Sequence, residues 1–255
     1  MATFLFNEIV FGPVKSRRLG VSLGVNLLPY NTKVCSFNCI YCECGWTLNK
    51  QSEKTKLPTR AEVREKLEKT LGQMASMPDV ITFAGNGEPT LHPEFAGIID
   101  DTIEVRNMLA PKTRIAVLSN ATMLHKEPVF NALLKVDDNI QKLDSACYET
   151  IQIINSPNTG FDLQKVVNQL AAFNGKVTIQ TILLRGSYNG RDFDNTTETE
   201  IAALLKLLAI IKPAHVMLYT IARNAPVDSL IKISSEETKA IAIKFQQAGF
   251  SVQVS

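Results

Sequence analysis

The stretch DVITFAGNGEP, residues 79–89, sets the fold expected for this chain. Its apolar and β-branched residues predict a short buried strand that passes directly into a loop with two glycines. Before it lies LPTRAEVREKLEKTLGQM, residues 57–74, where Thr59 and Glu62 predict a capping box at the start of an amphipathic helix. Another helix is expected to begin near Pro93. This order of helix, strand, loop and helix indicates a unit of a parallel α/β sheet.

The same alternation extends in both directions along the chain. Further strands are expected near residues 19–28, 114–122, 139–146, 176–186 and 215–223, with helices between them. We count about six parallel strands, and each connection is long enough for a right-handed crossover. Because a closed barrel needs eight such units, we predict an open, partial (β/α)6 barrel. We expect one α/β domain over residues 1–255, ending in a helix and strand over about 234–254.

Composition and charge narrow the class of protein. The chain is 45% hydrophobic and 20% charged, which is typical of globular proteins, and 27 basic residues nearly balance 25 acidic ones. This balance does not favour a nucleic acid partner, although a local basic patch leaves one open. The N-terminal residues do not resemble a signal peptide, and no apolar run approaches a membrane span. We therefore expect a cytoplasmic protein without a membrane partner.

Four of the five cysteines fall within KVCSFNCIYCECGW, residues 33–46, in a loop expected over about 30–46. In a reducing compartment, such a group indicates metal binding or catalysis rather than disulfides. Cys35, Cys39 and Cys42 suit three irons of a cubane cluster whose fourth iron stays open. A zinc site would need a second ligand pair, and a redox dithiol would leave the other thiols unused. The remaining candidates for zinc are isolated: Cys147, His92, His125 and His215.

The segment CSFNCIYC, residues 35–42, resembles the cluster motif of the radical S-adenosylmethionine (radical SAM) superfamily, including Tyr41 before the third cysteine. Other segments resemble the iron–sulfur oxidoreductase branch related to wyosine-type tRNA-modifying enzymes: SRRLGVSLGVNLLP (16–29), FAGNGEPTLHPEF (83–95), KLDSA (142–146) and YTIAR (219–223). The resemblance covers nearly the whole chain. The wyosine-synthesising relatives carry a second cluster on three additional upstream cysteines. None precedes Cys35 here, so wyosine synthesis itself is not expected.

The resemblance implies a [4Fe–4S] cluster on Cys35, Cys39 and Cys42, with S-adenosylmethionine on the fourth iron. One-electron reduction would cleave this cofactor to methionine and a 5′-deoxyadenosyl radical, which takes hydrogen from an unknown substrate. That substrate is left open between an anionic small molecule and a nucleoside. The electron would come from a flavodoxin- or ferredoxin-type reductant. The alternative is an iron–sulfur electron-transfer or structural metal-binding protein without this chemistry, which would not require the glycine loop.

The loop of residues 85–88 resembles the Gly-Gly-Glu-type loop that binds the methionine amino group in this family. Its alternative role is a simple βα turn. Residues 119–120 could equally form a helix cap or an Asx turn. Residues 142 and 144, expected on one face of a strand, could equally form a structural ion pair. The residues expected to contact the cofactor are Tyr41, Gly85, Asn86, Gly87, Glu88, Ser119, Asn120, Lys142, Asp144, Gln180, Tyr219 and Ile221.

The segment KSRR, residues 15–18, has no interleaved acidic residue and predicts a clamp for an anion, against the ordinary alternative of a solvated charge run. Expected substrate contacts are Lys15, Arg17, Arg18 and Arg185. We expect Cys44 to shape the cluster loop rather than bind iron, with a substrate-facing thiol as its other role. His92 is expected at a helix start.

Overall fold

The computed structural model describes residues 4–47, 56–223 and 225–255. Its main feature is an eight-stranded sheet in the order β1-β2-β3-β4-β5-β6-β9-β11. Strands β2 to β9 run parallel, as does β11, whereas β1 pairs antiparallel with β2. The strands are β1 (Val10–Ser16), β2 (Gly20–Val25), β3 (Val80–Phe83), β4 (Arg114–Ser119), β5 (Asp138–Lys142), β6 (Thr178–Ile182), β9 (His215–Tyr219) and β11 (Val252–Val254).

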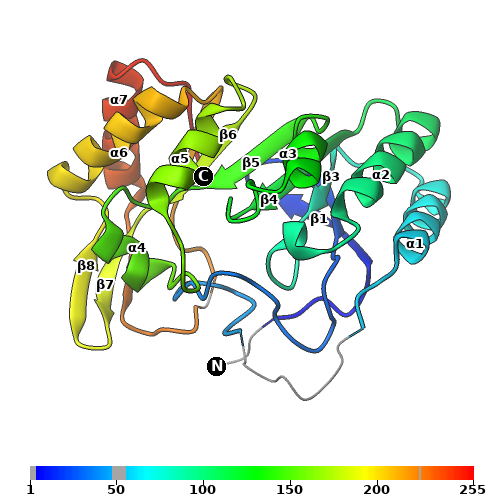
Figure 1. Ribbon diagram of the computed structural model, residues 1–255, viewed down its shortest axis with the longest axis horizontal. Coiled ribbons are helices and arrows are strands. Elements are labelled where there is room, and N and C mark those ends of the chain that lie inside the picture. The colour runs from blue at the N-terminus through cyan, green and yellow to red at the C-terminus, as the bar shows by residue number, and fades with distance from the viewer. Residues whose placement is uncertain (1–3, 48–55, 224) are drawn as a thin grey trace.

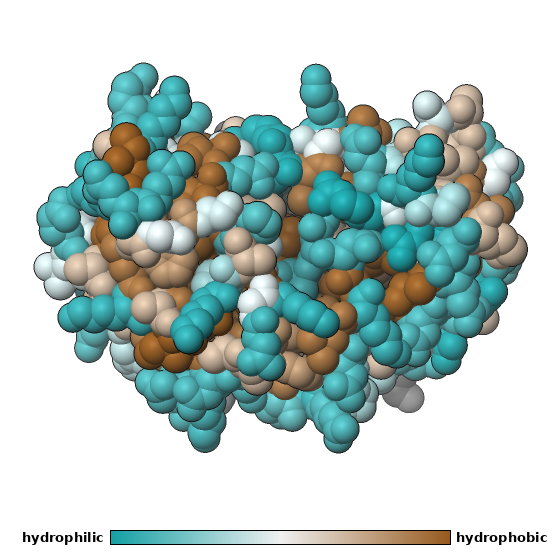
Figure 2. Space-filling model, turned by 90° about the horizontal axis from the view of Figure 1, so that it is seen from above, coloured by the Kyte–Doolittle hydropathy of each residue, from teal (hydrophilic) through white to brown (hydrophobic). Residues whose placement is uncertain are grey.

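Helices cover the outer face of this curled sheet, and a short helix lies beside a small second sheet (Figure 1). The expected open barrel with six parallel strands before a terminal helix and strand is confirmed. The face in Figure 2, seen from above, is mostly hydrophilic with scattered apolar residues. No helix of the described residues is long and apolar enough to cross a membrane. The helices are α1 (Arg60–Gln73), α2 (Phe95–Leu109), α3 (Glu127–Leu133), α4 (Tyr148–Ile154), α5 (Leu163–Ala171), α6 (Glu198–Ile211) and α7 (Ser235–Gln247), with a 3₁₀ turn at Pro89–Leu91.

The structure corrects the expected strands in three places. The N-terminal strand is one arm of a β1–β2 hairpin, whose other arm contains Gly12 and Pro13 and lacks the pattern of a strand. The strand expected over residues 176–186 is wrong, because the chain leaves the main sheet after Ile182. It enters a three-stranded antiparallel sheet of β7 (Leu184–Tyr188), β8 (Arg191–Asp194) and β10 (Leu230–Lys232). Finally, β5 ends at Lys142, so Asp144 is not on this strand.

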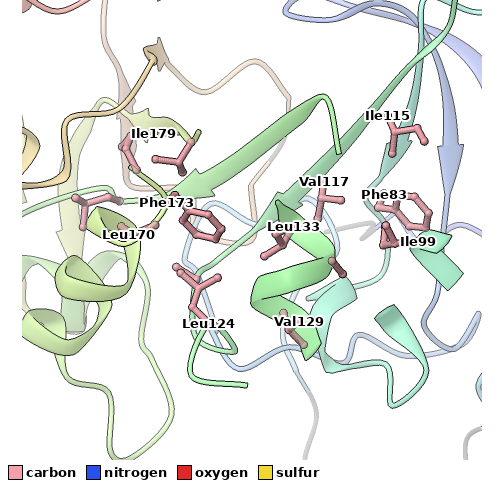
Figure 3. Packing of buried hydrophobic residues seen from close by; sticks show 14 of the residues in the cluster. Phe83, Ile99, Ile115, Val117, Leu124, Val129, Leu133, Leu170, Phe173 and Ile179 are labelled. Atoms are coloured by element: carbon pink, nitrogen blue, oxygen red, sulfur yellow. The ribbon is translucent and has the colours of Figure 1, made fainter. Parts of the chain in front are cut away.

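The main core lies between the outer face of the sheet and the helices. Figure 3 shows Phe83 and Val117 from β3 and β4 close to residues of α2 and α3. In another part of this core, the rings of Phe130 and Phe173 stack with their centroids 4.2 Å apart. A contiguous apolar layer of this kind is the main stabilising contribution to the domain.

A smaller apolar cluster fills the inner face near the amino ends of the strands. It contains Val80, Ala116, Ile140 and Met217, together with Leu19 from the β1–β2 turn. Because strand side chains alternate, the next inward positions lie nearer the carboxyl ends. There the lining becomes polar, and the interior stays open for ligands.

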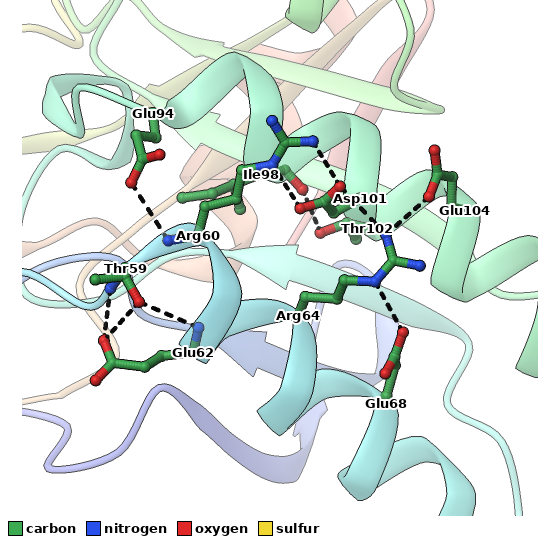
Figure 4. A network of polar contacts seen from close by, with 10 residues as sticks. All are labelled: Thr59, Arg60, Glu62, Arg64, Glu68, Glu94, Ile98, Asp101, Thr102 and Glu104. Atoms are coloured by element: carbon green, nitrogen blue, oxygen red, sulfur yellow. Dashed lines mark hydrogen bonds and ion pairs between the residues drawn. The ribbon is translucent and has the colours of Figure 1, made fainter.

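Polar contacts join α1 to α2 (Figure 4). The capping box of Thr59 and Glu62 is present as expected. Arg60 donates from Nε and Nη2 to the two oxygens of Asp101, over 2.6 and 2.7 Å. The Arg60 guanidinium lowers the pKa of Asp101 against the opposing effect of burial. Arg64 adds contacts to Asp101 and to the more exposed Glu104.

Replacing Asp101 should destabilise this part of the fold. The Asp101 side chain is 10% exposed, and loss of charge-assisted hydrogen bonds in Asp101→Asn should lower the free energy of unfolding by about 1.5–3 kcal/mol at pH 7. Glu104→Gln is the control, because Glu104 is 64% exposed and the expected change is below about 1 kcal/mol. Urea unfolding followed by circular dichroism measures both.

The effect of Asp101→Asn should depend on pH in a defined direction. Since the folded-state pKa of Asp101 is lowered, its contribution is complete above the unfolded-state pKa of about 3.9. The contribution is lost as the pH falls through the folded-state value. Equal stabilities of Asp101→Asn and Glu104→Gln at pH 7 would contradict a stabilising role for the Arg60 contact.

Candidate functional site

The candidate site lies at the carboxyl ends of the parallel strands. A cavity of about 190 Å³, called here the cysteine cavity, is lined by the thiols of Cys35, Cys39 and Cys42. Ligands of parallel α/β folds bind at this edge, where the loops follow the strands. The residues expected to contact the cofactor that line the cavity are Tyr41, Gly85, Gly87, Glu88, Ser119, Asn120, Lys142 and Gln180.

Backbone hydrogen bonds hold the cysteine segment on both sides. On one side, Val34 forms a parallel bridge with Gly87, and its N–H donates to the carbonyl of Asn86 over 2.8 Å. On the other side, the N–H of Ile40 donates to the carbonyl of Ile154 at the end of α4, over 3.0 Å. The segment is thus anchored to the glycine loop on one side and to the end of α4 on the other, which fixes where its side chains point.

The glycine loop allows a close approach that other residues prevent. Gly87 has φ 137°, and a Cβ added there would lie 1.8 Å from the carbonyl oxygen of Val34. Asn86, predicted to contact the cofactor, instead turns its side chain away from the cavity. Its amide exchanges hydrogen bonds with the backbone of Phe6 and donates to the carbonyl of Pro29. The Asn86 side chain therefore holds the N-terminal segment in place.

Several N–H donors point at the cysteine sulfurs. The backbone N–H of Phe37 donates to Cys35 Sγ over 3.4 Å. The side-chain amides of Asn120 and Asn155 lie 3.6 Å from the sulfurs of Cys35 and Cys39, respectively. Such donors stabilise sulfur when it carries negative charge.

A buried lysine adds positive charge near the cysteine sulfurs. Lys33 is 3% exposed, and its ammonium donates to the carbonyl of Gly45 over 2.9 Å. Lys33 and Asn155 were not predicted as site residues. For Lys33 a signal existed, because it stands two residues before the first cysteine. Asn155 gave none, since its position depends on the end of α4.

The pKa values of the cysteine thiols differ from one another. Burial raises the pKa of Cys35 to about 12. Contact with Cys44, helped by Lys33, lowers the pKa of Cys42 despite burial. The sulfur of Cys44 lies 3.2 Å from the carbonyl oxygen of Gly85, to which it donates. All five cysteines are free thiols, and in the described part of the chain no three His, Cys, Asp or Glu side chains converge on a single metal ion.

Lys142 provides a fixed positive charge beside the cysteines. Its ammonium donates to the Tyr219 hydroxyl over 3.0 Å and lies 3.7 Å from Asp144. Burial disfavours this charge, but Asp144 and Tyr219 outweigh burial and raise the pKa of Lys142. Asp144, predicted to contact the cofactor, already accepts from the Tyr41 hydroxyl, Asn155 and a backbone N–H. It therefore orients Lys142 and Tyr41.

Ser119, the last residue of β4, and Asn120 after it make local turns and also line the cysteine cavity. Ser119 Oγ accepts from the N–H of Ala121, and Asn120 Oδ1 accepts from the N–H of Thr122. The backbone N–H of Asn120 donates to the Glu88 carboxylate over 2.6 Å. Glu88 thus links the glycine loop to the end of β4, with its carboxylate oxygens already engaged. His92 accepts from the N–H of Glu94 just before α2, as its expected role at a helix start requires.

A second cavity of about 390 Å³, called here the basic cavity, adjoins the first. The two share the walls formed by Tyr41, Cys42, Ala84 and Leu118. Of the expected substrate contacts, Arg185 lies elsewhere, because it pairs with Asp194 and Glu237. The other expected substrate contacts, Lys15, Arg17 and Arg18, line the basic cavity. Tyr219 and Ile221, which were expected to contact the cofactor, line it as well.

Comparisons with known proteins agree with this arrangement. The Radical SAM superfamily model matches residues 31–199, which include all three cysteines. The chain is 32% identical to a UPF0026 protein of Methanocaldococcus jannaschii, over 92% of this chain and 70% of that protein. It is also 30% identical to a protein named GTPase Obg from Brachyspira hyodysenteriae, over 96% of this chain. The chain spans only 34% of that relative's length.

Solved structures share the fold at low sequence identity. A radical SAM methyltransferase from Sphaerobacter thermophilus aligns with TM-score 0.67 and 15% identity, over 92% of this chain and 65% of that one. Streptococcus suis SuiB bound to S-adenosylmethionine aligns with TM-score 0.63 and 12% identity, over 90% and 50% of the respective chains. The fold is thus the half barrel of radical SAM enzymes.

The family match covers more than half of the sequence, and the chain therefore belongs to the radical SAM superfamily. Membership implies an iron–sulfur cluster and S-adenosylmethionine as cofactors, together with a reductant and a substrate.

Gly87→Ala should disturb the cysteine segment. Strain at φ 137° and the contact with Val34 should lower the free energy of unfolding by about 1–3 kcal/mol, and thiol reagents should modify the cysteines faster. Gly72→Ala is the control. Gly72 lies in the last turn of α1 and is exposed, and no atom lies within 4 Å of a Cβ added there. It should stabilise by about 0.5–1 kcal/mol. Equal thiol reactivity in the two variants would contradict the close approach.

Proposed function

We propose that this chain binds a [4Fe–4S] cluster through Cys35, Cys39 and Cys42, binds S-adenosylmethionine beside it, and abstracts hydrogen from an anionic substrate. The observation that carries the proposal is the cysteine cavity, where three thiols face the glycine loop and the ends of β4, β5 and β6. Free thiols in a chain of this family suit a reducing, cytoplasmic setting.

The residues present fit a cluster. Three thiolates and the N–H donors of Phe37, Asn120 and Asn155 match the anionic character of iron–sulfur groups. Lys33 balances part of the negative charge from a buried position.

When bound, the cluster supplies the electron that splits the sulfonium of S-adenosylmethionine into methionine and a 5′-deoxyadenosyl radical. The protein positions the cofactor and excludes water from it. We assign the methionine amino group to the backbone around Gly85 and Gly87, which lines the cysteine cavity. The ammonium of Lys142 supports a carboxylate contact, because it stays charged beside Asp144.

Other polar residues of the two cavities complete the proposed cofactor site. Ser119, Asn120 and Gln180 line the cysteine cavity and offer hydrogen bonds to ribose hydroxyls. Tyr219 and Ile221 border the basic cavity, where an adenine ring would find apolar and aromatic contacts. The electron donor in this proposal is a flavodoxin- or ferredoxin-type protein.

Anaerobic reconstitution with iron and sulfide should test this function. We expect about four irons per chain, and 5′-deoxyadenosine on addition of S-adenosylmethionine and dithionite. Cys35→Ala, Cys39→Ala and Cys42→Ala should each lower product to background and change the cluster absorbance. Chromatography and iron assay provide the readouts.

Cys44→Ala and Cys147→Ala are the matched controls, and both should keep their iron. Loss of iron in Cys44→Ala would assign Cys44 as a ligand. A fully loaded cluster without cleavage would contradict radical chemistry and leave an electron-transfer protein.

A further inference from the structure

The basic cavity carries positive charge that the protein does not neutralise. Lys15, Arg17, Arg18 and Arg223 line it, against a single lining carboxylate, Glu43. Glu43 already pairs with Arg223 over 2.6 Å. Within the described ranges, no carboxylate lies within 4.0 Å of the other three cationic groups. A concave surface with this excess charge attracts anions.

Among these four cationic residues, Arg18 has a side-chain donor without an acceptor. Its Nη1 is buried and has no hydrogen-bond partner. Its guanidinium carbon lies 4.6 Å from the centre of the Tyr219 ring, a contact that keeps the planar group in one orientation. A buried donor without an acceptor is costly.

The backbone around Arg18 is also held in place. Its N–H donates to Ser16 Oγ over 3.3 Å within the β1–β2 turn. Its carbonyl accepts from the side chain of Gln253 in β11, over 3.1 Å. Thus both edges of the open sheet position this residue. A preorganised guanidinium binds an oxyanion at lower entropic cost than a free surface arginine.

The rest of the cavity suits an apolar body. Phe6, Phe11 and Ile182 line it, and Leu118 belongs to the wall shared with the cysteine cavity. A ligand held at one end by Arg18 would therefore extend along apolar surface toward Cys42. The volume of about 390 Å³ fits a small molecule.

We propose that the basic cavity is the substrate site, that the substrate is a small molecule with an apolar body and a terminal oxyanion, and that Arg18 binds this oxyanion. The oxyanion is a carboxylate or a phosphate, since an arginine fork binds either through two parallel hydrogen bonds. This proposal rests on the proposed function, because the other end of the substrate must reach the cofactor in the cysteine cavity.

Calorimetric titration of the reconstituted protein with three probes tests the assignment. The probes are 3-phenylpropionate, phenyl phosphate and the neutral 3-phenylpropan-1-ol. We expect at least one anion to bind about tenfold tighter than the alcohol, and the better anion identifies the head group. Arg18→Gln should weaken that anion by about tenfold or more while changing alcohol binding less than about twofold.

The matched control is Arg191→Gln, which removes the same charge from an exposed position on β8 outside both cavities. It should leave all affinities unchanged. Arg18→Lys should give an intermediate loss, because an ammonium keeps the charge but lacks the fork. If Arg18→Gln fails to fold by circular dichroism, the Arg18→Lys result decides: an unchanged anion affinity then overturns the proposal.

Three results would overturn the substrate site. Anions could bind no tighter than the alcohol, Arg191→Gln could weaken them as much as Arg18→Gln, or Arg18→Gln could chiefly weaken S-adenosylmethionine. The last result would assign Arg18 to the cofactor instead. Cleavage of S-adenosylmethionine by the same wild-type preparation, in the absence of substrate, reports separately on the proposed function.

Discussion

The backbone hydrogen bonds on either side of the cysteine segment are the constraint on which the site depends. The buried side chains of Phe37 and Ile40 anchor the segment, and its backbone contacts fix the direction of the chain between them. Here Val34 pairs with the glycine loop and Ile40 with the end of α4, so the segment is positioned by two units of the barrel. Gly87 is the residue that permits the first pairing. The cavity beside the thiols is therefore a product of the whole sheet.

Electrostatics organise the interior beyond the thiols. Lys33 and Lys142 place two buried or half-buried cations near the cysteines, while Arg18 and its neighbours place others in the adjoining cavity. Tyr219 touches both regions, since its hydroxyl accepts from Lys142 and its ring lies under Arg18. The inner face of the sheet thus has an apolar cluster near the amino ends of the strands and cationic side chains around the two cavities. These cations suit the anionic groups of a cofactor and a substrate.

Much of this organisation could be predicted from the sequence, because local patterns determine it. Alternating helices and parallel strands follow from hydrophobic periodicity, and the three cysteines are close in the chain. The second sheet was missed although Asn189 and Gly190, between β7 and β8, are a strong hairpin signal. Roles that depend on distant neighbours were not predictable. Asn86 and Asp144 carry suitable polar groups, yet their partners, such as Phe6 and Tyr41, come from other parts of the chain.

An open barrel leaves two sheet edges that a closed barrel would not have. Unpaired edge strands can recruit strands from other molecules and lead to aggregation. In β1 the register shifts between Phe11 and Val14, around a proline that has no N–H to offer. At the opposite edge, β11 is only three residues long. The features that leave the barrel accessible to ligands are therefore accompanied by edges poorly suited to intermolecular pairing.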